Sequence, residues 1–207
     1  MARYTGPRGR RARRLFVALT HLSTKDPDKD PSLRRPYPPG QHGPTQKTKM
    51  TDYGLRMMEK QKLKLSYELL EKQCRRYVDR AKRSGSNATQ VLITLIESRF
   101  DAMVLRAGYA TSIRQARQFV RHGYFTVDGK KANLPGMEFK PGTTVELRER
   151  FRQHPLVLQV REKTAHRGVP SHVALLEGGK GFRVLTRPED IDPPVALDLA
   201  KIIEFYA

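Results

Sequence analysis

The chain has 207 residues and a formal net charge of +19 at pH 7, because 40 Lys and Arg residues outnumber 21 Asp and Glu residues. That length predicts one or two domains with a modest hydrophobic core. A positive excess of this size exceeds what solubility requires, and it indicates binding to nucleic acid or to an anionic membrane surface. The membrane is disfavoured, since no apolar run approaches about 18 residues and neither a signal peptide nor a lipidation motif is visible.

Cysteine and histidine usage argues against disulfide bonds and metal sites. Cys74 is the only cysteine, so no internal disulfide can form and the chain fits a reducing cytoplasm. It falls in a helical pattern and is interpreted as a small core residue. The six histidines show no metal-ligand spacing, and no phosphate loop or nucleophile elbow is present. We therefore expect no metal, no cofactor, no catalytic residue and no small-molecule substrate.

Residues 1–45 are predicted to form a basic, irregular N-terminal extension. The stretch "GPRGRRARR" is basic, and "RRPYPPGQHGP" is crowded with Pro and Gly. Such a segment buries too little apolar surface to order itself. It is either a disordered tail or an extension that becomes ordered on RNA, and its Pro and Gly residues, which preset turns, favour the second interpretation. Tyr4, Tyr37 and His42 would then stack on RNA or hydrogen-bond to it.

Residues 46–95 are predicted to form a mostly helical domain. Two helices are expected within 51–83, and a further apolar helical stretch over 88–107 is expected to break near Ser98. The final stretch, 195–207, reverses the charge of the chain and ends in the apolar pattern "ALDLAKIIEFY". We expect it to form a helix that joins the helical domain, because it would otherwise expose an apolar patch.

The segment "TSIRQARQFVRHGYFTVDGK" predicts a short amphipathic helix that ends at Gly123. Thr111 or Ser112 can cap its start. Helical spacing places apolar residues on one side and arginines on the other: Ile113, Ala116, Phe119 and Val120 opposite Arg114, Arg117 and Arg121. No acidic residue occurs from Thr111 to Val127, so we expect a polyanionic partner to offset the repulsion between the arginines.

A hairpin follows this helix directly. "YFTV" is rich in residues that favour strands, and Asp128-Gly129 is a strong signal for a two-residue turn. The turn is followed by Lys130 and Lys131, so a lysine-bearing turn is expected beside the arginine face. This arrangement suits a backbone of phosphates better than a small-molecule pocket.

The hairpin is predicted to lie in an α/β module over residues 98–187. A Pro-Gly turn and a strand through Val145 close the hairpin region, and short strands are expected around "LVLQV", "HVALL" and "FRVL". "EGGKG" (177–181) lacks the spacing of a phosphate loop and is interpreted as a hairpin turn. The expected fold class is α+β: a mostly helical domain plus an α/β RNA-binding module with a helix pair and a small antiparallel sheet.

Five blocks of the sequence together resemble one family. "RRPYPPGQHG", "DYGLRMMEKQK", "IESRFDAMVLRAG", "SIRQARQFVRHGYFTVDGK" and "IIEFYA" are similar, in the same order, to blocks of bacterial small-subunit ribosomal protein four, the S-four family. Many members carry a four-cysteine zinc site near the N-terminus. Gly9 and Ala12 stand where its first cysteine pair would be expected, so this chain resembles a zinc-free version.

The resemblance implies a structural protein of the small ribosomal subunit and no enzymatic activity. It implies primary binding to 16S rRNA at a junction in the 5′ domain, nucleation of subunit-body assembly, and an influence on translational accuracy. It also implies contacts with ribosomal proteins five and three, and with mRNA near the channel through which mRNA enters the ribosome. The expected location is the cytoplasmic ribosome.

Residues of the S-four-type motif and the basic extension are the candidate RNA contacts. They are Arg3, Tyr4, Arg8, Arg10, Arg11, Arg13, Arg14, Arg34, Arg35, Tyr37, Gln41, His42, Lys60, Lys62, Arg99, Arg114, Gln115, Arg117, Arg121, His122, Lys130 and Lys131. The resemblance implies contact with protein five through Asp52, Tyr53, Glu204 and Phe205, with Glu204 available to that neighbour.

Two other classes of protein fit parts of the pattern. An RNA-modifying enzyme could use the same module as a targeting arm, but the chain leaves no stretch large enough for a catalytic domain. A DNA-binding regulator would need the second helix of a helix-turn-helix, which the helix–hairpin lacks. Footprinting of bound cellular RNA separates these alternatives.

Overall fold

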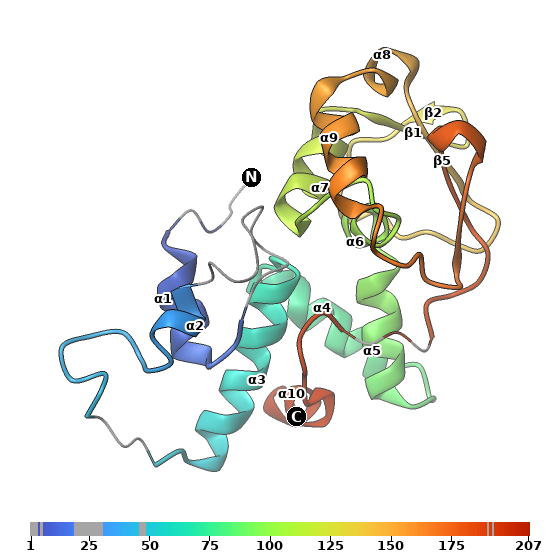
Figure 1. Cartoon of the computed structure of the whole chain (residues 1–207). Helices are drawn as coiled ribbons and strands as arrows, with labels where there is room; N and C mark the ends of the chain where they lie inside the picture. Colours follow the sequence, from blue (N-terminus) through green and yellow to red (C-terminus); the bar gives the residue numbers. More distant parts are fainter. Residues whose placement is uncertain (1–3, 5, 19–30, 46–48, 190, 192) are drawn as a thin grey trace. The chain divides into compact units, whose positions relative to one another are not determined.

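The computed structural model describes residues 4, 6–18, 31–45, 49–189, 191 and 193–207 (Figure 1). The chain divides into two compact units. The first contains residues 1–92 together with 192–207, and the second contains residues 93–191. The fold is α+β, as predicted, with the described strands forming one antiparallel sheet in the second unit.

The basic N-terminal stretch contains a helix, so the prediction that 1–45 is irregular is wrong for this part. Helix α1 spans Arg8–Leu15 and a short helix α2 spans Pro31–Arg34. Arginine and alanine are good helix formers, which favours α1 despite its charge. Ala12 and Leu15 lie three positions apart and are both buried, which anchors one side of the helix.

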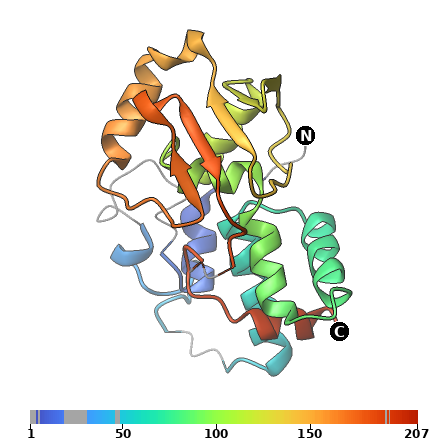
Figure 2. The same cartoon turned by 90° about the vertical axis from the view of Figure 1, so that its right-hand side faces the viewer.

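Four further helices contribute to the first unit: α3 (Asp52–Ser66), α4 (Glu71–Lys82), α5 (Ala88–Glu97), which continues into the second unit, and α10 (Leu199–Phe205). Thr51 caps α3 by accepting a hydrogen bond from the Gly54 backbone N–H. The C-terminal helix α10 packs against α3 (Figure 2), where Ile202 is fully buried.

Cys74 is also fully buried in the first unit, which confirms its interpretation as a core residue. The other buried apolar side chains of α3 and α4 are Leu63, Leu65, Tyr77, Val78 and Ala81. Burial raises the pKa of the Cys74 thiol, so the side chain stays neutral and behaves as a small apolar group.

The second unit combines helices with the sheet. Its remaining elements, in chain order, are α6 (Phe100–Arg106), α7 (Ile113–Arg121), β1 (Phe125–Val127), β2 (Lys130–Lys131), β3 (Thr144–Leu147), α8 (Glu149–Arg152), α9 (Pro155–Thr164), β4 (Val173–Leu175), the 3-10 turn η3 (Glu177–Gly179) and β5 (Gly181–Val184). The strand order is β2-β1-β3-β5-β4, and every pairing is antiparallel. The "EGGKG" stretch joins β4 to β5, which confirms its interpretation as a hairpin turn.

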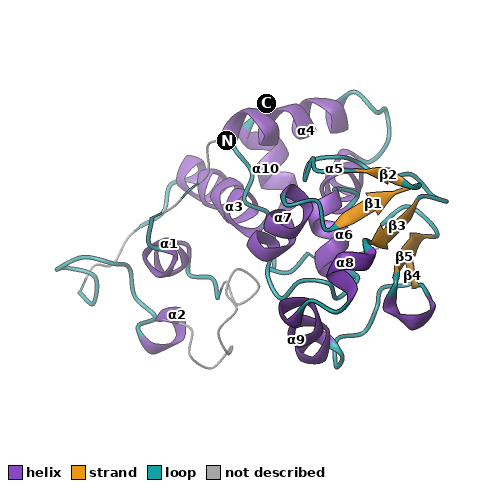
Figure 3. Cartoon of the chain, turned by 90° about the horizontal axis from the view of Figure 1, so that it is seen from above, coloured by secondary structure: helices purple, strands orange, loops and turns teal. Residues whose placement is uncertain are grey.

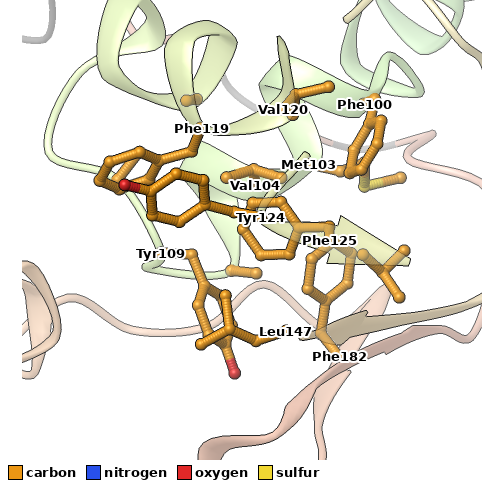
Figure 4. Close-up of a cluster of buried hydrophobic side chains, with 14 of the residues drawn as sticks. Phe100, Met103, Val104, Tyr109, Phe119, Val120, Tyr124, Phe125, Leu147 and Phe182 are labelled. Atoms are coloured by element: carbon orange, nitrogen blue, oxygen red, sulfur yellow. The ribbon is translucent and has the colours of Figure 1, made fainter. Parts of the chain in front are cut away.

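Alternating residues of the strands place one apolar face of the sheet against the helices. Phe125 pairs with Leu147 in register, and Val145 pairs with Phe182, so these buried side chains lie side by side. Helices α6 and α7 cover this face (Figure 3) and contribute Phe100, Met103 and Val104 from α6 and Phe119 and Val120 from α7 to the core (Figure 4). The core fixes how α7 presents its opposite side.

The prediction of a strand around "LVLQV" is wrong, because residues 155–164 form helix α9. Pro155 occupies the first turn, where its missing N–H has no cost, and the His154 ring nitrogen accepts a hydrogen bond from the Leu156 N–H. Val157, Val160 and Thr164 are buried at helical spacing. Packing of this apolar stripe on the core outweighs the strand propensity of the valines.

Candidate nucleic-acid interface

Helix α7 is capped by the residues that precede it. The Ser112 hydroxyl accepts a hydrogen bond from the Gln115 N–H at 3.4 Å. In return, the Gln115 side-chain oxygen accepts from the Thr111 N–H and the Thr111 hydroxyl, each at 2.8 Å. This reciprocal capping satisfies N–H groups at the start of the helix. The side-chain oxygen of Gln115 thus stabilises the start of the helix, and the contact of Gln115 with RNA stays a prediction.

The amphipathic pattern predicted for α7 is confirmed. Its buried residues are Ile113, Ala116, Phe119 and Val120. The arginine side consequently faces away from the core, with Arg121 exposed and Arg114 half-buried. Gly123 follows the helix with a positive φ of 69°, which glycine adopts without a side-chain clash, and the chain then turns directly into β1.

Arg117 has an acidic partner that lies outside the stretch from Thr111 to Val127. The Asp101 carboxylate in α6 accepts hydrogen bonds from Arg117 Nη2 at 2.9 Å and from Arg117 Nε at 3.2 Å. The side chain of Arg117 retains only 15% exposure and that of Asp101 none. The expectation that nothing nearby offsets the charge of the arginines is therefore wrong for Arg117, which links α7 to α6.

Asp101 also binds Arg99, which was predicted to contact RNA. Arg99 donates from Nε and Nη2 to the two carboxylate oxygens at 3.0 and 2.8 Å. Only 1% of the Arg99 side chain is exposed, so its guanidinium lies inside the second unit rather than on its surface. One buried carboxylate thus holds two guanidinium groups, and we correct the assignment of Arg99 to a structural role.

The hairpin turn forms as predicted. Asp128 and Gly129 have φ values of 47° and 77°, as a two-residue turn between these strands requires. The Asp128 carboxylate also accepts a hydrogen bond from the Thr144 N–H at 2.8 Å, which fixes the turn to β3. Lys130 and Lys131 are exposed on β2, directly after the turn.

The end of α7 and the hairpin lie together. A Cβ built on Gly123 would stand 3.2 Å from Cε of Lys131, and Arg148 Nη1 donates to the Gly123 carbonyl oxygen at 3.3 Å. These contacts gather basic side chains from α7, β2 and the end of β3. We call this surface the basic face and define it by six residues: Arg114, Arg121, His122, Lys130, Lys131 and Arg148.

Sequence reasoning missed Arg148 and its neighbours. Arg150 lies over the ring of Phe151 at 4.5 Å, and Phe151 stacks on Tyr124 with 3.8 Å between ring centroids. Arg152 donates from Nε to the Leu147 carbonyl oxygen at 3.2 Å. The alternation of arginines in "LRERFRQH" was the available signal, although the fold alone places Arg148 beside Gly123.

Most basic residues predicted in the N-terminal extension lie at the surface. Arg3 lies outside the described residues. Arg11 lies over the Tyr4 ring at 3.3 Å from its centroid, and Arg13 donates to backbone carbonyls of residues 35, 37 and 38. The exposed members of the predicted set are Arg10, Arg11, Arg14, Arg34, Arg35, Gln41 and His42, whereas Tyr4, Arg8, Arg13 and Tyr37 are half-buried.

The two lysines predicted on α3 are held by intrachain contacts. Lys60 is only 7% exposed, and its ammonium group lies 4.0 Å from the Phe205 ring centroid and 3.3 Å from the Glu71 carboxylate. Lys62 pairs with Glu59 at 2.6 Å, with little of either side chain exposed. Lys60 therefore connects α3 to α4 and to the C-terminal helix, whereas Lys62 pairs within α3, and contact of either residue with RNA stays a prediction.

The predicted protein-contact residues divide into exposed and paired side chains. Tyr53 is 64% exposed and packs on Phe205 with ring centroids 5.5 Å apart. Asp52 is exposed in the first turn of α3. Glu204 pairs with Arg56 at 2.9 Å but keeps 54% of its side chain exposed, so its contact with a neighbour stays a prediction.

Glu71 connects the C-terminal helix to α3. The Tyr206 hydroxyl donates to Glu71 Oε1 at 2.6 Å, and Lys64 donates to Oε2 at 2.6 Å. Burial tends to raise the pKa of Glu71, but the hydrogen bonds from Lys64 and Tyr206 and the lysine charges lower it to about 2. The carboxylate is therefore charged at neutral pH, and it holds α10 in place.

Within the described part of the chain, no group of three or more His, Cys, Asp or Glu side chains could hold a metal ion. The same residues include no helix with the length and apolar character needed to cross a membrane. In the second unit, the packed core holds the cationic side chains of the basic face at the surface. This arrangement is suited to binding phosphates by electrostatic attraction.

Comparisons with known proteins agree with this chemistry. Residues 3–97 match the family described as "Ribosomal protein S4/S9 N-terminal domain", and residues 98–145 match the "S4 domain". The chain is 41% identical over 210 aligned positions to the small ribosomal subunit protein uS4 of Persephonella marina, with all of both chains covered. It is 40% identical to that of Aquifex aeolicus, with 100% of this chain and 99% of the relative covered, and 39% identical to that of Geobacillus stearothermophilus, with both fully covered. The chain therefore belongs to the bacterial family of small-subunit ribosomal protein four, uS4.

Proposed function

We propose that this protein is a primary 16S rRNA-binding component of the small ribosomal subunit. Its relatives are named as proteins of that subunit, and the family is structural rather than enzymatic. In the proposed role, the protein grips a multi-helix junction in the 5′ domain of the rRNA and nucleates assembly of the subunit body. The single observation that carries the proposal is the basic face. Its side chains come mainly from the capped helix α7 and the β1–β2 hairpin, which both pack on the core of the second unit.

Binding through the basic face depends on phosphate neutralisation. Arg121, His122, Lys130 and Lys131 are exposed, and no acidic residue occurs between Thr111 and Val127. Cationic side chains that contact phosphates release the counterions bound to the RNA. The free energy gained from this release falls as the salt concentration rises. Selectivity for a junction then comes from the shape of the RNA, because the spacing between α7 and the hairpin is fixed by the core.

Affinity measured as a function of salt tests this role. Replacing Arg114 and Arg121 together with alanine is expected to weaken binding to 16S rRNA and to reduce the log–log salt slope by roughly 0.7–0.9 for each lost phosphate contact. The matched control replaces both residues with lysine, which keeps the charges and should keep the slope. Arg117 is left intact, since its loss would also disturb Asp101. An unchanged slope in the alanine variant would show that the basic face does not contact the RNA.

The proposal extends to the neighbours of the protein in the subunit. We propose contact with ribosomal protein five through the surface around Asp52, Tyr53 and Phe205, with an influence on translational accuracy. Tyr53 supports this, because its aromatic side chain is 64% exposed and tyrosine is enriched at protein–protein interfaces. Contacts with ribosomal protein three and with mRNA near its channel into the ribosome belong to the same proposal.

A further inference from the structure

The loop that follows α2 is organised around one side chain, that of Arg13 in α1. Arg13 Nε shares its N–H between the carbonyl oxygens of Arg35 and Tyr37, at 3.1 and 3.0 Å. Arg13 Nη2 donates to the Pro38 carbonyl oxygen at 3.3 Å. The guanidinium carbon also lies over the Tyr37 ring, 4.8 Å from its centroid. One half-buried cation therefore holds three successive points of the loop.

These carbonyl groups need a donor because the loop has few of its own. Pro36, Pro38 and Pro39 carry no backbone N–H, and the segment belongs to no strand. Half-buried carbonyls without a partner cost free energy, and a guanidinium offers five donors in a fixed fork. An ammonium group in the same place would be a compact charge on a flexible stem, without the planar fork that spans several carbonyls.

The loop also closes on itself next to this clamp. The Gly43 N–H donates to the Gly40 carbonyl oxygen at 3.2 Å. A Cβ at position 43 would overlap the Pro38 carbonyl oxygen, so only glycine fits there. Arg34, Arg35, Gln41 and His42 are exposed around this closed turn. A rigid loop thus carries a cluster of polar and basic side chains outward.

We propose that Arg13 is a positioning residue that presets this loop for RNA, rather than a phosphate contact. This inference rests on the proposed rRNA-binding function. It also differs from the expectation that the N-terminal extension becomes ordered only on RNA, because the clamp lies entirely within the protein. Ordering the loop in advance lowers the entropy that RNA binding would otherwise lose.

Arg13→Lys separates the two roles because it keeps the charge and removes the fork. If Arg13 only neutralises a phosphate, the lysine variant should bind rRNA almost as well as the unchanged protein. If Arg13 positions the loop, affinity should fall on the order of tenfold while the salt slope stays the same. Arg76→Lys is the matched control, since Arg76 is exposed on α4 and is not among the predicted RNA contacts.

A second measurement uses the free protein and needs no RNA. Trypsin can cut between Arg34 and Arg35, and mass spectrometry reports the rate at that bond. We expect Arg13→Lys to accelerate this cleavage and Arg76→Lys to leave it unchanged. Gly43→Ala opens the loop without changing any charge, so it should accelerate the same cleavage and weaken rRNA binding in the same way.

The outcomes distinguish the inference from the proposed function. Equal cleavage and equal affinity in Arg13→Lys and Arg76→Lys would overturn the positioning role alone. Faster cleavage with unchanged rRNA affinity would also overturn it, because the loop would then not serve binding. Absence of rRNA binding by the unchanged protein would overturn the proposed function, and the positioning role with it.

Discussion

Removing the charge of Asp101 is expected to destabilise the second unit strongly. Asp101→Asn keeps the shape of the side chain but removes the carboxylate charge that the Arg99 guanidinium, which is 1% exposed, contacts inside the unit. Breaking a buried ion pair from one side costs about 3–5 kcal/mol, because the remaining charge cannot return to water. We expect the lower end of this range, since the Asn oxygen can still accept one hydrogen bond and the partly exposed Arg117 can relax toward solvent.

Differential scanning calorimetry and urea unfolding measure this effect. For a unit of this size, about 3 kcal/mol corresponds to a decrease in Tm of at least ~12 °C. The matched control is Glu149→Gln in the same unit, because the Glu149 side chain is 88% exposed and pairs with Arg152 at 3.5 Å. That variant should change the free energy of unfolding by less than about 1 kcal/mol. An Asp101→Asn protein within about 1 kcal/mol of the unchanged one would refute the reasoning.

Three further predictions concern the C-terminal helix and the residues that contact it. Glu71→Gln should lower the free energy of unfolding at pH 7. This difference from the unchanged protein should shrink as the pH falls from about 4.5 to about 2. A carboxylate with a lowered pKa stabilises the fold above its ordinary pKa and loses that effect as it becomes protonated. Chemical unfolding across this pH range checks it, and a difference that stays constant with pH would contradict it. Tyr53→Ser should leave rRNA binding and stability nearly unchanged, while it weakens contact with protein five and raises misreading in a reporter assay. In contrast, removal of residues 202–207 deletes the fully buried Ile202 and should lower the free energy of unfolding by at least about 2 kcal/mol. Normal accuracy with Tyr53→Ser in assembled subunits would exclude Tyr53 from that contact.

Local signals were sufficient to predict the centre of the candidate site. The apolar side of α7, the cap at Ser112, the end at Gly123 and the turn at Asp128-Gly129 all depend on neighbours within a few residues along the chain. For such features, helical spacing and the backbone freedom of glycine decide the structure. Sequence patterns therefore recover them without knowledge of the rest of the fold.

Features that depend on distant residues could not be predicted in this way. Asp101 reaches Arg117 across 16 positions, and Arg148 reaches Gly123 across 25. The burial of Lys60 depends on Phe205, which arrives from the other end of the chain. The wrong prediction of a strand at α9 has a different cause. The sequence contains the helix signals, which are the Pro at the start and the spacing of Val157 and Val160, but the strand propensity of valine favoured the wrong prediction.

The position of α10 has a consequence for the order in which the protein folds during its synthesis. Residues 1–92 and 192–207 belong to one unit, and the whole of the second unit is translated between them. The core of the first unit lacks Ile202 until that interval has passed, whereas residues 93–191 form a continuous stretch that folds without waiting for later residues. The core of the first unit can therefore close around α10 only after the whole of the second unit has been synthesised.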